Sequence, residues 1–147
     1  MITLLFLFVG VVSAIVVGIV LSKLGAAYSR WPYAAIVVAA AAIYLLIQSP
    51  STPDNWQFTW YAGIAAFAVL AVLGLFRSPW WIAIGLLLHG VFDSAVTIAG
   101  ASTWVGSAYG PWCAGFDIAL SLIFILRVCV TPESRISRDG DLKSSKI

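Results

Sequence analysis

Long apolar stretches separated by short polar ones run along most of the chain. Each stretch is close to the roughly 20 apolar residues that a helix needs to cross the hydrocarbon core of a bilayer. The breaks between them carry prolines, glycines and charged residues, which are typical of helix ends. The pattern predicts membrane-spanning helices at about residues 2–21, 31–47, 58–76, 80–99 and 111–130. We therefore expect an all-α, polytopic transmembrane bundle of five spans.

The expected organisation is one five-helix transmembrane domain over residues 1–131 and a polar tail over residues 132–147. The first apolar stretch is longer than the core of an ordinary signal peptide. Its basic neighbours, Lys23 and Arg30, follow it instead of preceding it. Because a cleaved signal has the opposite polarity, we predict that this stretch is a retained span.

Composition excludes an ordinary soluble domain. The chain is 62% hydrophobic and 10% charged, whereas soluble domains are about 45–50% apolar and about 25% charged. A soluble fold of this size has no means of hiding so much apolar surface. The expected partner is the lipid bilayer, with the protein as a multi-pass component of the cell (inner or plasma) membrane. The net charge of +2 is spread thinly, so nucleic acid is not an expected partner.

The basic residues all fall on one side of a five-span topology. Because these side chains concentrate on the cytoplasmic face of membrane proteins, the distribution predicts an external N-terminus and a cytoplasmic tail. The opposite side carries Asp54 and no basic side chain. The eight basic residues are Lys23, Arg30, Arg77, Arg127, Arg135, Arg138, Lys143 and Lys146.

Two stripes of polar and small residues run along the last two predicted spans at four-residue spacing. Residues four apart lie on one face of a helix, and the two spans are antiparallel and joined by a short connection. We therefore expect the stripes to be neighbours, with Asp93 and Asp117 at similar depth in the outer half of the membrane. The stripes are Gly85, His89, Asp93 and Thr97 in the first span, and Cys113, Asp117 and Ser121 in the second.

Ionisable residues inside a membrane indicate function, because placing a carboxylate at its centre costs about 2.5–3.5 kcal/mol. His89, Asp93 and Asp117 are therefore the candidate catalytic residues. We expect the Asp93 carboxylate to accept a hydrogen bond from a ring N–H of His89, and Asp117 either to share a proton with Asp93 or to bind a cation. In an enzyme, Asp117 or Asp93 would be the acid and His89 the base.

Further polar and aromatic residues are predicted to converge on the same place. Together with the ionisable groups they predict a polar pocket facing the outer leaflet. The expected ligand is a small lipophilic or cationic molecule, with acid–base chemistry on it as one option, and whether the protein is an enzyme stays open. The candidate ligand-binding residues are Tyr44, Gln48, Trp60, Tyr61, Thr97, Trp112, Cys113 and Ser121.

Several alternatives remain open at this point. One is that His89 and the two aspartates only link helices through hydrogen bonds. The three could also hold a metal with Cys113 as a fourth ligand, but one histidine and no ligand motif count against it, and the cofactor stays unknown. A proton-coupled transporter and a non-catalytic accessory subunit of a larger membrane complex are further options. The small residues Gly10, Ala14 and Gly18, four apart, suit either packing within the bundle or formation of a homo-oligomer.

Two motifs carry a resemblance. Ser78-Pro79-Trp80-Trp81 leads to His89-Gly90-Val91-Phe92-Asp93, and Tyr109-Gly110-Pro111-Trp112-Cys113 leads to Ala114-Gly115-Phe116-Asp117. This half of the chain resembles small bacterial multi-span membrane proteins that share a domain of unknown function. Those proteins pair a His-x-x-x-Asp helix with a later Cys-x-x-x-Asp helix. The resemblance implies a membrane helix bundle and no particular activity.

Overall fold

Helices account for nearly all of the described part of the computed structural model, which covers residues 2–23, 30–47, 54–98 and 108–130. No strand occurs among these residues, so the all-α prediction is confirmed. The predicted tail, 132–147, lies outside them. The five helices are α1 (Ile2–Lys23), α2 (Arg30–Ile47), α3 (Asp54–Phe76), α4 (Trp80–Ile98) and α5 (Tyr109–Val130).

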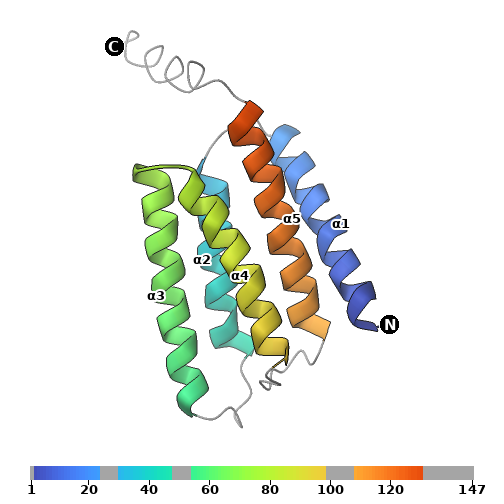
Figure 1. Cartoon of the computed structure of the whole chain (residues 1–147), viewed down its shortest axis with the longest axis vertical. Helices are drawn as coiled ribbons and strands as arrows, with labels where there is room; N and C mark the ends of the chain where they lie inside the picture. The colour runs from blue at the N-terminus through green and yellow to red at the C-terminus, as the bar shows by residue number, and fades with distance from the viewer. Residues whose placement is uncertain (1, 24–29, 48–53, 99–107, 131–147) are drawn as a thin grey trace.

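The helices form an up-and-down bundle in which each runs antiparallel to the one before it (Figure 1). α4 lies in the middle, where it contacts α2, α3 and α5. α1 packs along α5 at one edge, and α2 packs along α3 at the other (Figure 1). The contacts between α4 and α5 bring together the two spans whose polar stripes the sequence analysis expected to be neighbours.

The outer surface of the bundle is that of a membrane protein. α1, α3, α4 and α5 are long and apolar enough to cross a membrane, and α2 is a shorter apolar helix. Large apolar side chains point away from the bundle on several helices, with Phe8 63%, Val72 52% and Leu126 64% exposed. In water such a surface would drive association, whereas lipid chains solvate it.

Glycines let α1 and α5 approach each other closely. A Cβ atom on Gly10 would overlap the backbone carbonyl of Trp112, and one on Gly115 would overlap the backbone carbonyl of Leu7. Between Gly10 and Gly18, Ala14 is fully buried. Of the two roles expected for this small-residue stripe, the structure therefore shows packing within the bundle.

The basic side chains within the described residues gather at one end of the bundle. This end contains the last residues of α1, α3 and α5 and the first residues of α2 and α4 (Figure 1). Arg127 on α5 donates to the Gly18 carbonyl on α1 at 2.8 Å and also to the Ser22 hydroxyl. Arg30 on α2 donates to the Leu75 carbonyl on α3 at 3.3 Å. These arginines bind carbonyls near helix C-termini, where a positive charge is favourable.

Candidate functional site

The buried polar side chains of the bundle come from α4 and α5. Among the described residues, those that are polar or charged and buried are His89, Asp93, Asp117 and Ser121. His89 lies at the middle of α4, and Asp93 follows one turn later, farther from the basic end. Asp117 lies about two turns after the start of α5, which is at the end of the bundle away from the basic residues. The antiparallel pairing of the two helices therefore sets the two aspartates at similar depth.

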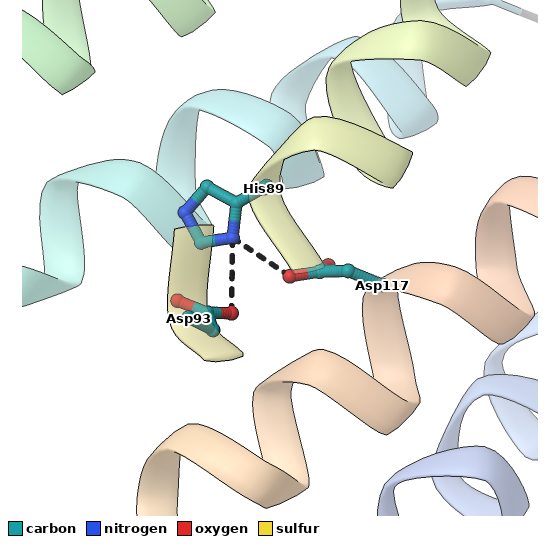
Figure 2. A group of neighbouring side chains, drawn as sticks. All are labelled: His89, Asp93 and Asp117. Carbon is teal, nitrogen blue, oxygen red and sulfur yellow. Dashed lines mark hydrogen bonds and ion pairs between the residues drawn. The ribbon is translucent and has the colours of Figure 1, made fainter. Parts of the chain in front are cut away.

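One nitrogen of His89 faces both carboxylates (Figure 2). Its Nδ1 lies 2.8 Å from Oδ2 of Asp117 and 3.2 Å from Oδ2 of Asp93. The exposed fractions of the three side chains are 1% or less. The sequence analysis expected His89 to contact Asp93 of its own helix, and the structure has this contact together with a shorter one to Asp117 on α5. The four-residue spacing sets the direction of the Asp93 side chain, whereas helix packing brings Asp117 closer.

Gly90 is the residue that lets α5 come so close to His89. A Cβ atom at this position would lie 3.2 Å from the Ala114 carbonyl oxygen and 3.5 Å from Cβ of Asp117, and would crowd the Ile118 side chain at 2.8 Å. A larger residue would therefore push α5 away from α4 next to the site. The His89–Asp117 contact thus depends on a small residue beside the histidine.

A third helix holds Asp93 in place. The Tyr44 hydroxyl on α2 donates a hydrogen bond of 2.5 Å to Oδ1 of Asp93. The Tyr44 ring stacks on Trp60 of α3 with ring centroids 4.6 Å apart and an interplanar angle of 12°. Phe92 meets Tyr44 edge-on at 5.8 Å. These contacts leave Tyr44 little freedom, so they fix the orientation of the Asp93 carboxylate.

The surroundings of the histidine ring are otherwise apolar. Phe67 of α3 lies 4.7 Å from the His89 ring, centroid to centroid, and is itself buried. Charges interact strongly in such a place, because an effective dielectric constant of about 20 gives about 4 kcal/mol between unit charges 4 Å apart. Two ionised carboxylates here therefore repel each other unless a positive species lies between them.

Several predicted ligand-binding residues lie near this group without joining it. Trp60 is buried and reaches the site through Tyr44. Cys113 is buried one turn before Asp117, but it does not belong to the His89–Asp93–Asp117 group. The structure therefore does not place Cys113 as a fourth metal ligand beside these three residues.

Two predicted hydroxyl ligands bind backbone carbonyls instead. Thr97 donates to the Asp93 carbonyl of its own helix at 2.8 Å. Ser121 donates across to the Ala83 carbonyl on α4 at 2.9 Å. Both therefore stabilise helices and helix packing in the structure.

The remaining predicted residues are not brought to the group. Tyr61 is 59% exposed, although its neighbour Trp60 is buried. Trp112 stacks on Phe116 one turn along α5, with centroids 5.7 Å apart. Gln48 lies outside the described residues. Successive residues on a helix point about 100° apart, which separates Tyr61 from Trp60.

Two aromatic residues near the site were missed by the sequence analysis. Tyr109 meets the Tyr44 ring edge-on at 6.0 Å. It precedes Cys113 by four residues and Asp117 by eight, so the stripe on α5 extended backwards would have included it. Phe67 had no such signal, because an apolar residue within an apolar span looks like any other lipid-facing or core position.

His89, Asp93 and Asp117 form a compact set of donor atoms. One donor atom from each lies within 4.8 Å of the others, so the three side chains could hold a metal ion together. Ser94, a conceivable nucleophile beside them, instead donates to the Gly90 carbonyl of its own helix at 2.9 Å. The arrangement therefore suits holding a cation or a proton better than attack by a serine.

Comparisons with family models, with curated proteins and with solved structures found no significant match for the chain. The resemblance of the α4 and α5 motifs to small bacterial membrane proteins therefore stays a prediction.

Proposed function

We propose that this protein binds a small ligand, lipophilic or cationic, inside the membrane at His89, Asp93 and Asp117. One observation carries the proposal. Two carboxylate oxygens from different helices face a single histidine nitrogen, at 2.8 and 3.2 Å, in a place that is almost completely buried. One N–H group is a poor match for two acidic partners, so the arrangement supports a site that receives a further positive or polar group.

The energetic cost of the site argues against a purely structural role. Each carboxylate at the membrane centre costs about 2.5–3.5 kcal/mol, whereas an average hydrogen bond between membrane helices contributes about 0.6 kcal/mol. The same bundle already links α4 to α5 through the Ser121 hydroxyl and the Ala83 carbonyl, without any ionisable group. Two aspartates and a histidine are therefore an expensive means of joining helices.

We also propose that all five helices cross the membrane and that the site lies in its outer half. α2 has 18 residues, or about 27 Å at 1.5 Å per residue, and it runs beside α3 and α4 (Figure 1). With the basic end in the cytoplasm, Asp93 lies on the external side of the middle of α4. A ligand would then enter from the external side.

Native mass spectrometry of the full chain, released from membranes in a mild detergent, tests the binding proposal. We expect a bound species on the wild type that is absent from His89→Ala and Asp117→Asn. Ser94→Ala is the matched control, because this side chain lies next to Asp93 in the sequence but bonds only to its own helix. It should keep the bound species.

The opposite result would favour the structural role. If the two site variants fold and carry the same bound species as the wild type, or if no variant carries any, the binding proposal fails. A lower melting temperature as the only change would mean that the three residues link helices.

A further inference from the structure

We propose that the ligand of this site is a divalent first-row transition-metal ion, such as Mn²⁺, Fe²⁺ or Zn²⁺, with Tyr44 orienting one of its carboxylate ligands. The inference rests on the proposed function, because it names the ligand of that same site. It assigns His89, Asp93 and Asp117 as the protein ligands.

The separations of the two carboxylates from His89 are close to those in a coordination shell, and all three donor atoms lie within 4.8 Å of one another. Nitrogen and oxygen ligands bind zinc at about 2.0–2.2 Å, so two ligands at angles of 90–109° lie about 3.0–3.4 Å apart. The observed separations from Nδ1 of His89 are 2.8 Å to Asp117 and 3.2 Å to Asp93. All three groups are positioned before an ion arrives, which reduces the entropy lost on binding.

The charges balance with a divalent ion. Two ionised carboxylates and a neutral imidazole carry a charge of −2, and a divalent cation makes the group neutral. With only an additional proton on the imidazole, the group keeps a charge of −1 among apolar neighbours such as Phe67. Because an uncompensated buried charge is costly, a divalent cation is a suitable occupant for the group with both carboxylates ionised.

The type of ligand narrows the choice of metal. Imidazole suits zinc, iron, copper and nickel, whereas carboxylates suit magnesium, calcium and manganese. Calcium takes six to eight oxygen ligands, which the described residues around His89 do not offer. Soft ions such as Cu(I) select thiolates, and Cys113 is not part of the group. Three protein ligands also leave a position for water or another exchangeable ligand, as in catalytic zinc sites.

Unpartnered polar atoms are a second observation that indicates a missing ligand. Oδ1 of Asp117 and Oδ2 of Asp93 are buried and have no hydrogen-bond partner among the described residues. Buried polar atoms are nearly always paired. In a metal complex, Oδ1 of Asp117 becomes the second oxygen of a carboxylate that can bind through both oxygens.

Tyr44 has the position of a residue that orients a metal ligand. Its hydroxyl binds the Asp93 oxygen that faces away from His89, and its ring is fixed by stacking on Trp60. Carboxylates that bind metals are themselves hydrogen-bonded, and losing such a partner lowers metal affinity about 10- to 100-fold. Tyr44 is thus a positioning residue that acts through Asp93.

Metal analysis of the full chain tests the assignment. The protein is purified in mild detergent from cells supplied with Mn²⁺, Fe²⁺ and Zn²⁺, and its metal content is measured by mass spectrometry. We expect about one transition-metal ion per chain, retained in Ser94→Ala and reduced at least about tenfold in His89→Gln and Asp117→Asn. Size-exclusion profiles and circular dichroism establish that the variants are folded.

A pair of tyrosine variants tests the positioning role. Zn²⁺ and Mn²⁺ are titrated into the metal-stripped protein, and Mg²⁺ is the comparison ion. Tyr44→Phe should weaken Zn²⁺ or Mn²⁺ affinity about 10- to 100-fold. Tyr33→Phe is the matched control on the same helix: Tyr33 is buried and packs on Phe124, and its hydroxyl has no partner among the described residues. It should leave the affinity unchanged.

Three results of the metal measurements would overturn the assignment. They are a wild type with no transition metal, equal metal in the wild type and the folded site variants, and tighter binding of Mg²⁺ than of Zn²⁺ and Mn²⁺. An organic species that depends on His89 and Asp117, found without metal, would also end it while leaving the proposed function intact. If neither species is found, both proposals fail.

Discussion

At the scale of single residues, two kinds of buried polar side chain occur one turn apart on α5. The Ser121 hydroxyl donates to the Ala83 carbonyl, an acceptor that already belongs to a helix. Asp117 instead faces an imidazole nitrogen that a second carboxylate also faces. If the Ser121 hydroxyl is removed, the Ala83 carbonyl keeps its bond within the helix. If Asp117 or His89 is removed, the other is left buried with one partner fewer, and this change costs more free energy.

Replacing Ser121 with alanine should therefore have only a small effect on stability. We expect the free energy of unfolding to fall by about 0.6 kcal/mol, the average for hydrogen bonds between membrane helices. Reversible unfolding in mixed micelles, followed by circular dichroism, measures it. A loss well above the maximum of about 1.7 kcal/mol found for such bonds would mean that Ser121 does more than join α4 to α5.

At the scale of helices, backbone-to-backbone contact holds α1 against α5. Burial of apolar surface contributes little between helices in lipid, so association depends on close packing and hydrogen bonds. Gly115 lies directly over the Leu7 carbonyl of α1, and Gly10 lies over the Trp112 carbonyl of α5. Near the basic end, Arg127 adds a hydrogen bond to the Gly18 carbonyl. The edge helix thus needs small residues to remain in the bundle.

Gly115→Ala should destabilise the bundle, because its Cβ would overlap a backbone atom that has no rotamer to change. We expect a loss of about 1–3 kcal/mol, as for other overpacked positions, measured by the same unfolding experiment. Gly63→Ala on α3 is the control, since its Cβ would meet only Phe92 at an ordinary 3.8 Å. Because alanine favours helix by about 1 kcal/mol over glycine, this control should be neutral or stabilising. Equal losses in both variants would contradict the close contact of α1 with α5.

At the scale of the whole molecule, charge and polarity are divided between the two ends of the bundle. The basic residues of the described chain lie at one end of the bundle (Figure 1). Asp93 and Tyr44 lie in the halves of α4 and α2 that are nearer the other end. The positive-inside rule gives such an asymmetric bundle one orientation. The orientation decides from which side of the membrane the proposed ligand would reach the site.

Reporter fusions test this orientation. A fluorescent protein that matures only in the cytoplasm should be bright when fused after Ile147 and dark when fused after Thr103, which follows α4. Basic side chains retain their segments in the cytoplasm, which is the physical reason for the expected pattern. The reverse pattern would place the site in the inner half of the membrane and contradict an external entry route.

The sequence alone determined which segments form helices and which helix faces carry the polar residues. The length of the apolar stretches sets the first, and the four-residue spacing sets the second. The helices follow from hydrogen bonding, since a chain crossing lipid must pair its backbone groups within each segment. The positions of His89, Asp93 and Asp117 on helix faces follow from the helical repeat alone. Tyr109 continues the four-residue spacing of Cys113 and Asp117 on α5, so the same spacing also predicts its position.

Contacts between helices were decided only by the tertiary structure. Nothing in the spacing along α4 indicates that His89 lies nearer to Asp117 than to Asp93, because that distance depends on how closely Gly90 lets α5 approach. The same holds for Tyr44, whose hydroxyl reaches Asp93 from a helix 49 residues away in sequence. In an almost uniformly apolar chain, every face of a helix is a plausible contact surface. Side-chain shape in the packed bundle therefore selects the partners.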